Sequence, residues 1–253
     1  MARRISFDRR IELAWMDALT DELRAGRSEG ELRDFLHDLL RSDHPADTAR
    51  GKTITVLMRT WALVPPEHRS LRRHALQLQE EVPRSDFIWL HWGMLLVGFP
   101  IFRDIASGVG RLLSLQGDVS LAQLQRRLTE EYGERSTVSR ASQRIVRSMV
   151  EWGAIQEGEK KGVFLPAQKR TTGSSDLQLW LMEALLTAKD AETVEATQLL
   201  KSHELFPFSI DIGVRDLRRS DHFVVHRQGQ SMDVVEVRQQ DEESEDGLTL
   251  PLS

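Results

Sequence analysis

Apolar residues in the first 98 positions recur at helical spacing, and short polar connections separate the stripes. Ser28 precedes one stripe and Glu31 follows three residues later, which is the pattern of a capping box. Short connections between helices favour a compact bundle, so residues 1–98 are predicted to form a helical bundle. The first stripe stops at Gly26 and consists of Phe7, Ile11, Leu13, Trp15, Leu19 and Leu23, and further helices are expected at about 48–61, at about 67–81 and from about 85.

The most apolar run of the chain is IWLHWGMLLVGFPIF, Ile88 to Phe102. Its 15 residues are fewer than the roughly 20 that a membrane-spanning helix needs, and Gly98 and Pro100 interrupt it. The run therefore predicts two buried helical pieces that meet near Gly98, and it predicts no membrane as a partner.

Residues 99–167 carry three further helical patterns followed by a short hairpin pattern. The first helix, IFRDIASGVGRLLSLQG, contains Gly108 and Gly110, which should allow close packing, and it ends at Gly117. The second begins after Ser120, and the third runs from a cap at Ser136 or Thr137 to Gly153. AIQEGEKKGVFLP then predicts two short strands, and three helices and a hairpin in this order are typical of a winged helix-turn-helix.

Residues beyond 167 predict a linker at 168–175, a small α+β module at 176–238 and an acidic, disordered tail at 239–253. Within the module, a helix is expected at 176–188 and strands at FPFSIDI, HFVVHRQ and MDVVEVR. Leu205 to Phe208 should enter the first strand, with an exposed docking motif as the alternative. The predicted fold class is mainly α: an N-terminal helical bundle, a winged helix-turn-helix and a small α+β C-terminal region.

The helix expected from Ser136 to Trp152 has two faces of different chemistry. Its apolar residues recur every three or four positions and form a stripe that should be buried: Val138, Ala141, Ile145, Met149 and Trp152. The neighbouring face is polar and carries Arg140, Gln143, Arg144 and Arg147. No acidic residue lies between Arg135 and Val150, so this face is predicted to be cationic.

A cationic face of this kind suits the major groove of DNA, where arginine can bond to guanine and glutamine to adenine. Ser136, Thr137 and Ser139 lie near the helix start, where hydroxyl and backbone N–H groups suit a phosphate oxygen. Arg126 and Arg127 on the preceding helix, and Lys160 and Lys161 at the hairpin tip, are expected to contact the DNA backbone. The alternative is that these arginines only solvate an exposed helix and pair with Glu130, Glu131 and Glu134.

Charge is distributed unevenly along the chain, whose net charge is −5. Residues 1–170 hold 27 Lys and Arg against 23 Asp and Glu, and residues 171–253 hold 7 against 16. The basic part therefore contains the candidate DNA-binding helix. A second basic cluster, EHRSLRRHALQ with Arg69, Arg72 and Arg73, together with Arg3, Arg4, Arg9 and Arg10, could extend the contact along a duplex or simply form an exposed face.

Signals for catalysis are weak. The chain has no cysteine, which excludes disulfides and cysteine-ligated zinc and is compatible with a reducing cytosol. It also lacks HExxH, Walker A, GxSxG and dinucleotide-binding motifs. Asp221 and the strand residues Glu236-Val237-Arg238 resemble a nuclease motif only faintly, since Glu-x-Arg on a strand is commonplace. We expect no enzyme activity, no catalytic residue, no cofactor and no metal site.

The order of the parts resembles that of the BrxA-like proteins of bacterial BREX phage-defence systems. The resemblance covers residues 5–166 and includes RRIELAWMDALTDELRAG, LLRSDHPADTARGKTITVLMRTWALVP and STVSRASQRIVRSMVEWGAI, with Ser136, Thr137 and Gly153 at the ends of the last helix. It implies a helical domain similar to the antitermination factor NusB, followed by a DNA-binding winged helix. Residues 171–253 depart from the compact pattern of the family and are interpreted as an added partner-binding module.

These observations favour a cytoplasmic, non-enzymatic subunit of a phage-defence assembly that binds double-stranded DNA and other protein subunits. One alternative is an adaptor whose winged helix and acidic C-terminal region bind partner proteins. Another is a winged-helix transcription regulator, which would need a symmetric dimer and a palindromic site.

Overall fold

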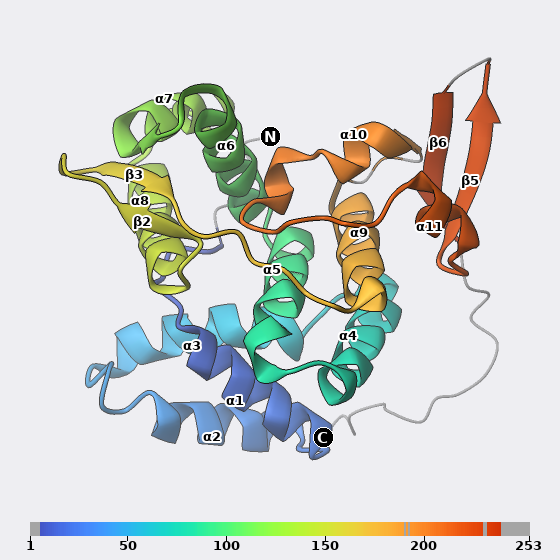
Figure 1. Ribbon diagram of the computed structural model, residues 1–253. Coiled ribbons are helices and arrows are strands. Elements are labelled where there is room, and N and C mark those ends of the chain that lie inside the picture. Colours follow the sequence, from blue (N-terminus) through green and yellow to red (C-terminus); the bar gives the residue numbers. More distant parts are fainter. Residues whose placement is uncertain (1–5, 190, 192, 230–231, 239–253) are drawn as a thin grey trace.

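The computed structural model describes residues 6–189, 191, 193–229 and 232–238, and within them the chain is mainly helical (Figure 1). The described strands form two small antiparallel sheets of three strands each. This confirms the mainly α fold class with small sheets.

The N-terminal helices are arranged as a bundle: α1 (Leu13–Arg24), α2 (Glu29–Leu39), α3 (Asp47–Trp61), α4 (Arg69–Glu81) and α5 (Phe87–Gly98). Short 3-10 turns, Pro66–His68 and Arg84–Asp86, precede α4 and α5. The capping box of α2 is confirmed, because the backbone N–H of Ser28 donates to Glu31 Oε2 at 2.8 Å and Ser28 Oγ accepts from the Glu31 N–H at 3.5 Å.

The predicted start of the first helix is wrong. Phe7 and Ile11 are fully buried, as their apolar pattern predicts, but the helix begins only at Leu13. The backbone of Ile11 instead bonds to a distant helix, with its N–H donating to Ser148 Oγ (2.9 Å) and its carbonyl accepting from Trp152 Nε1 (2.8 Å). These tertiary bonds replace the helical ones, so the segment before Leu13 is not helical.

The most apolar run divides into α5 and α6 (Pro100–Gln116), which meet at Phe99, so the prediction of two buried helical pieces is confirmed. Pro100 starts α6, where its missing N–H costs nothing. No single helix among the described residues is long and apolar enough to cross a bilayer; only the pair Arg84–Gly98 and Pro100–Gln116, bent by 118°, passes that test by length and composition.

Residues 100–166 fold as α6, β1 (Val119–Ser120), α7 (Leu121–Tyr132), α8 (Ser136–Glu151), β2 (Ile155–Glu157) and β3 (Val163–Pro166). β3 lies between β1 and β2 and is antiparallel to both, with Val119 opposite Phe164 and Gln156 opposite Leu165. The predicted glycine stops are confirmed, because Gly117 and Gly153 follow α6 and α8 with φ of 80° and 66°.

The C-terminal part contains α9 (Ser175–Lys189), β4 (Val194–Glu195), α10 (Ala196–Leu200), a 3-10 turn (His203–Leu205), α11 (Val214–Arg219), β5 (Phe223–Gln228) and β6 (Met232–Val237). β6 pairs with both β4 and β5. The expected helix at 176–188 and the two later strands are confirmed. The predicted acidic tail, residues 239–253, lies outside the described residues.

The predicted strand FPFSIDI is wrong, and Leu205 to Phe208 is not an exposed docking motif either. Leu205 and Phe208 are 3% and 5% exposed, and the Phe208 ring lies 4.2 Å from that of Trp89 in α5. Phe206 packs edge-on against Trp92 at 5.2 Å. The alternating pattern therefore comes from a loop that inserts its aromatic residues into the helical core.

One continuous cluster of buried side chains includes residues of the N-terminal bundle, of the 100–166 unit and of the C-terminal part. Five tryptophans of this cluster are at most 2% exposed: Trp61, Trp89, Trp92, Trp152 and Trp180. Close packing at the glycines of α6 is also confirmed, since a Cβ on Gly110 would lie 2.0 Å from the carbonyl oxygen of His203.

Candidate nucleic-acid interface

Helix α8 has one buried and one exposed face, as its sequence pattern predicts. Val138, Ala141, Ile145 and Met149 are at most 1% exposed. The opposite face is open to solvent and carries Ser136, Thr137, Arg140, Gln143, Arg144 and Arg147. These positions recur at three- and four-residue steps, so they form one contiguous surface along the helix.

Two arginines at the middle of this surface have no acidic partner. Arg140 and Arg144 are exposed, and neither forms an ion pair with a carboxylate in the described part of the chain. Arg140 makes only a long hydrogen bond, 3.4 Å, from Nε to the backbone carbonyl of Ser136 in its own helix. Both guanidinium groups are therefore available to an external anion.

Four further basic residues near α8 are also exposed and have no acidic partner among the described residues. Arg126 and Arg127 are exposed on α7, and Lys160 and Lys161 are exposed in the turn between β2 and β3. Figure 1 shows α7 above α8 and the hairpin of β2 and β3 beside α8, with its turn projecting to the left of the view. Among the described residues none of the four has an ion-pair partner.

Arg147 and Ser139 have internal partners instead. Arg147 Nη1 lies 2.5 Å from Glu157 Oε1 on β2, and its Nε lies 3.6 Å from Glu151 Oε1. Ser139 is half-buried, and its hydroxyl accepts a hydrogen bond from Gln125 Nε2 on α7 at 3.0 Å. Both residues therefore help to position α8 against its neighbours.

The start of α8 differs from the prediction. Its N-cap residue is Arg135, not Ser136 or Thr137, and no side chain caps the helix. Arg135 instead donates from Nε and Nη2 to the carbonyl of Tyr132, at 2.9 and 2.6 Å, which holds the turn between α7 and α8. The N–H groups of the first turn thus have no capping side chain as acceptor, so the positive end of the helix dipole is available to an anion.

The residues of the second predicted basic cluster do not share one exposed surface. Arg72 is largely buried and donates from Nη1 to the carbonyls of Trp61 and Ala62 at the end of α3, at 3.4 and 3.3 Å, and burial lowers its pKa. Arg9 pairs with Asp8, and Arg10 with Glu12 and Glu151. Arg3 and Arg4 lie outside the described residues. This cluster therefore does not form one open cationic face.

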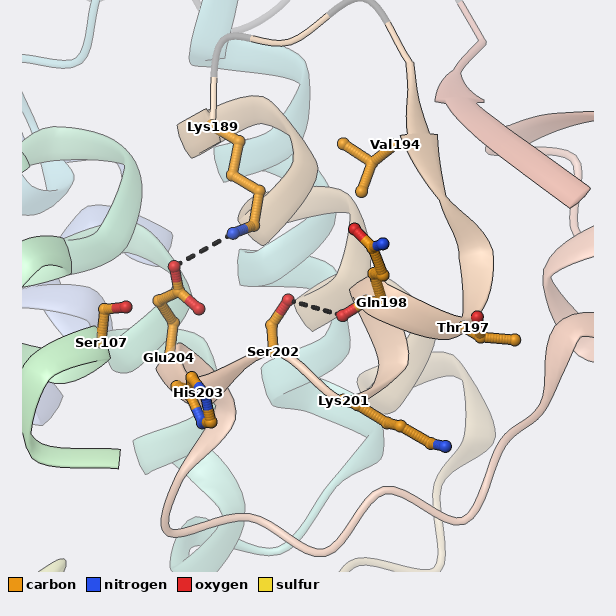
Figure 2. A pocket seen from close by; sticks show the side chains of 9 residues that line it. All are labelled: Ser107, Lys189, Val194, Thr197, Gln198, Lys201, Ser202, His203 and Glu204. Atoms are coloured by element: carbon orange, nitrogen blue, oxygen red, sulfur yellow. Dashed lines mark hydrogen bonds and ion pairs between the residues drawn. The ribbon is translucent and has the colours of Figure 1, made fainter. Parts of the chain in front are cut away.

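A pocket of about 590 Å³ lies between α6, α9 and the loop that carries Glu204 (Figure 2). Figure 2 shows Lys189 Nζ directed at Glu204 Oε1, 3.0 Å away, and the Ser202 hydroxyl directed at the Gln198 carbonyl. Within the described part of the chain, neither Ser107 nor Ser202 bonds to His203. Lys189 and Ser202 thus bond to other groups of the protein.

One cluster of metal-ligating side chains was missed by sequence reasoning: His74, Glu183 and His222. The carboxylate of Glu183 raises the pKa of His222, and burial partly offsets this effect. No spacing rule connects the three residues, because each comes from a different segment. The faint nuclease pattern gains no support, because Glu236 pairs with His226 at 3.0 Å and does not line the pocket beside His222 that contains Asp221.

Comparison with known protein families, curated proteins and solved structures found no match to this chain. The interpretation of its surface therefore depends on its own residues.

Proposed function

We propose that this chain is a cytoplasmic, non-enzymatic protein that binds double-stranded DNA, with α8 as the helix that enters the major groove. The observation that carries the proposal is the exposed, unpaired face of Arg140, Gln143 and Arg144 on a helix whose other face is buried. An exposed arginine without a carboxylate partner contributes little to the stability of the fold. The same arginine can form strong charge-assisted hydrogen bonds to a phosphate or a base edge.

The proposal includes a winged helix-turn-helix in residues 100–166. It is supported by the element order α6-β1-α7-α8-β2-β3 and by the strand order β1-β3-β2. In this architecture the last helix lies in the major groove and the hairpin lies beside it, over the backbone. The hairpin turn with Lys160 and Lys161 would then act as the wing.

The proposed contacts separate into two kinds. Arg140, Gln143 and Arg144 would reach base edges, because arginine bonds bidentately to guanine and glutamine to adenine. Phosphates would be contacted by cations on the flanking elements and by hydroxyl and N–H groups at the start of α8: Arg126, Arg127, Lys160, Lys161, Ser136 and Thr137. Arg147 and Ser139 are assigned to positioning α8, because Glu157 and Gln125 already hold them.

The direct test replaces the two central arginines. We expect Arg140→Ala with Arg144→Ala to weaken binding to a duplex of mixed sequence by at least about 30-fold in fluorescence anisotropy, because each lost bidentate contact costs roughly 1–3 kcal/mol. The control is Arg33→Ala with Arg41→Ala, which removes the same charge from α2 and from the turn after it, where each arginine pairs with a carboxylate. Equal retention of DNA by the parent and the Arg140/Arg144 variant, with both folded, would refute the proposal.

A salt titration provides a second, independent readout. If the four unpaired cations of α7 and the β2–β3 turn neutralise about four phosphates, the plot of log K against log salt concentration should have a slope of about −4. A slope near zero would show that binding does not depend on phosphate neutralisation.

The place of the protein in a phage-defence assembly is part of the same proposal and is supported by the resemblance of residues 5–166 to BrxA-like proteins. In such an assembly the chain would bind DNA and contact other subunits, with residues 171–253 as the candidate partner-binding region. A folded parent protein that fails to bind DNA but co-purifies with the product of a neighbouring gene would favour the adaptor alternative. A symmetric dimer on a palindromic site would favour a transcription regulator.

A further inference from the structure

Three side chains that can ligate a metal converge where the C-terminal sheet meets the helical body. His74 comes from α4, Glu183 from α9 and His222 from the residue before β5. One ligand atom from each lies within 4.8 Å of the other two. The convergence is a product of tertiary structure.

The three groups are close to the separation that a shared metal ion requires. Glu183 Oε2 lies 3.2 Å from Nδ1 of His222 and 3.9 Å from Nδ1 of His74. The two imidazole rings are stacked with an interplanar angle of 10° and centroids 4.6 Å apart. Donors bound to one tetrahedral zinc at 2.0–2.2 Å lie about 3.4 Å apart, so a small side-chain rotation would bring the set into position.

Both histidines lie within ion-pair distance of Glu183, but two of the atoms in these contacts lack a well-formed hydrogen bond. Nδ1 of His74 and Oε2 of Glu183 are buried and have no hydrogen-bond partner of acceptable geometry in the described part of the chain. The Glu183 side chain is only 12% exposed. Since an unsatisfied buried polar atom is costly, a cation placed between the three atoms would satisfy all of them together.

We propose that His74, Glu183 and His222 bind a divalent transition metal ion, with zinc as the ion that best fits the donors. Two imidazoles and one carboxylate form a borderline donor set that suits zinc and related ions, whereas magnesium and calcium prefer oxygen ligands throughout. A histidine–carboxylate contact that binds no metal is the alternative that the experiment distinguishes.

The surroundings of the cluster also favour a cation. A pocket of about 360 Å³ opens beside the two histidines, and its lining includes Asp176, Asp216 and Asp221. These carboxyl groups increase the negative potential at the site, and the pocket leaves room for a water molecule as the fourth ligand. Arg219 on the same lining opposes this effect only in part, because it contributes one positive charge against three acidic side chains.

The bound ion would connect α4 and α9 of the helical body to the start of β5. In Figure 1 these elements lie on the other side of α5 from α7 and α8. The metal site is therefore separate from the proposed DNA interface, and either proposal can fail without the other.

The test uses the full chain after treatment with a chelator. We expect it to bind one equivalent of Zn²⁺ and, in its place, one equivalent of Co²⁺ with visible absorption bands of a four-coordinate site. At a free Zn²⁺ concentration of about 100 times Kd, Tm should rise by about 5 °C.

The decisive variant is Glu183→Gln, which keeps the shape of the side chain and removes its charge. Loss of a residue that only supports a ligand costs up to about 100-fold in metal affinity. Because Glu183 is proposed as a direct ligand, we expect Glu183→Gln to weaken Co²⁺ binding by at least about 100-fold, and we expect the same of His222→Asn. The control is His226→Asn, because His226 also lies 3.0 Å from a carboxylate, Glu236, but at an exposed position without a third ligand. The proposal is overturned if the parent binds no equivalent of either ion, if folded Glu183→Gln binds as tightly as the parent, or if His226→Asn also loses binding.

Discussion

Alanine at position 110 should destabilise the protein although alanine favours helices. Gly110 lies within α6, where a glycine-to-alanine change normally stabilises by about 0.5–1 kcal/mol. Here the added Cβ would lie 2.0 Å from the carbonyl oxygen of His203 and 2.9 Å from its carbonyl carbon. Ordinary contact begins at 3.4 Å, so the two backbones must separate by more than 1 Å.

The structure explains why this separation is costly. The contacted atom belongs to the backbone and cannot rotate away as a side chain could. The loop is also fixed on both sides of His203, because Trp92 Nε1 donates to the Glu204 carbonyl at 2.9 Å and Phe206 packs against Trp92. Overpacking of a core costs about 1–3 kcal/mol. A backbone contact this close belongs at the upper end of that range, so after the gain in helix propensity we expect a net loss of about 2 kcal/mol.

Equilibrium urea unfolding followed by tryptophan fluorescence measures this change, and two other glycines calibrate it. Gly51→Ala in α3 meets nothing within 4 Å and should stabilise by about 0.5–1 kcal/mol. In Gly108→Ala the added Cβ would lie 2.7 Å from the flexible end of Leu124, so its change in the free energy of unfolding should lie between those of the other two variants. If Gly110→Ala were as stable as Gly51→Ala, the close approach of α6 to the 203–208 loop would be wrong.

Three further predictions concern pH, capping and charge. Burial lowers the pKa of His91, whose Nδ1 accepts a hydrogen bond from Trp61 and whose Nε2 faces Asp17. Below about pH 6.5 only the unfolded chain takes up this proton, so the free energy of unfolding should fall by up to about 1.4 kcal/mol per pH unit. Urea titrations between about pH 7 and 5 should show a shallower loss for His91→Gln. Ser28→Ala removes the N-cap of α2 and should cost about 1 kcal/mol by thermal unfolding, whereas an unchanged Tm would contradict the capping role. Glu134→Gln removes an exposed negative charge beside the start of α8, so duplex affinity should rise several-fold at low salt; an unchanged affinity would show that this turn lies away from the DNA.

Local rules predicted most elements because the relevant signals lie within a few residues of each other. The capping box of Ser28 and Glu31, the left-handed Gly117 after α6 and the two faces of α8 each depend on short-range spacing. The same rules failed where tertiary contacts compete with local ones. Phe7 and Ile11 follow helical periodicity, but Ile11 bonds to Ser148 and Trp152 and lies outside the helix.

In the candidate sites, too, features that depend on local spacing could be predicted and features that depend on tertiary contacts could not. Exposure of Arg140 and Arg144 follows from their place on α8, and their role in DNA binding stays a prediction. The pairing of Arg147 with Glu151 was not predicted, although i,i+4 spacing favours it, and the second partner of Arg147, Glu157, depends on the position of β2. His74, Glu183 and His222 could not be connected from sequence, because only packing brings their segments together.

The central helix α5 also bears on how the chain is made. Its tryptophans are covered by residues from a much later segment: Phe208 on Trp89, and Phe206 and the Glu204 carbonyl on Trp92. The ribosome releases α5 well before that segment, so its large aromatic surface meets solvent until residue 208 has emerged. A fragment ending at residue 166 would contain every proposed DNA contact yet leave that surface bare, so an excised DNA-binding unit should aggregate unless the 203–208 segment is supplied with it.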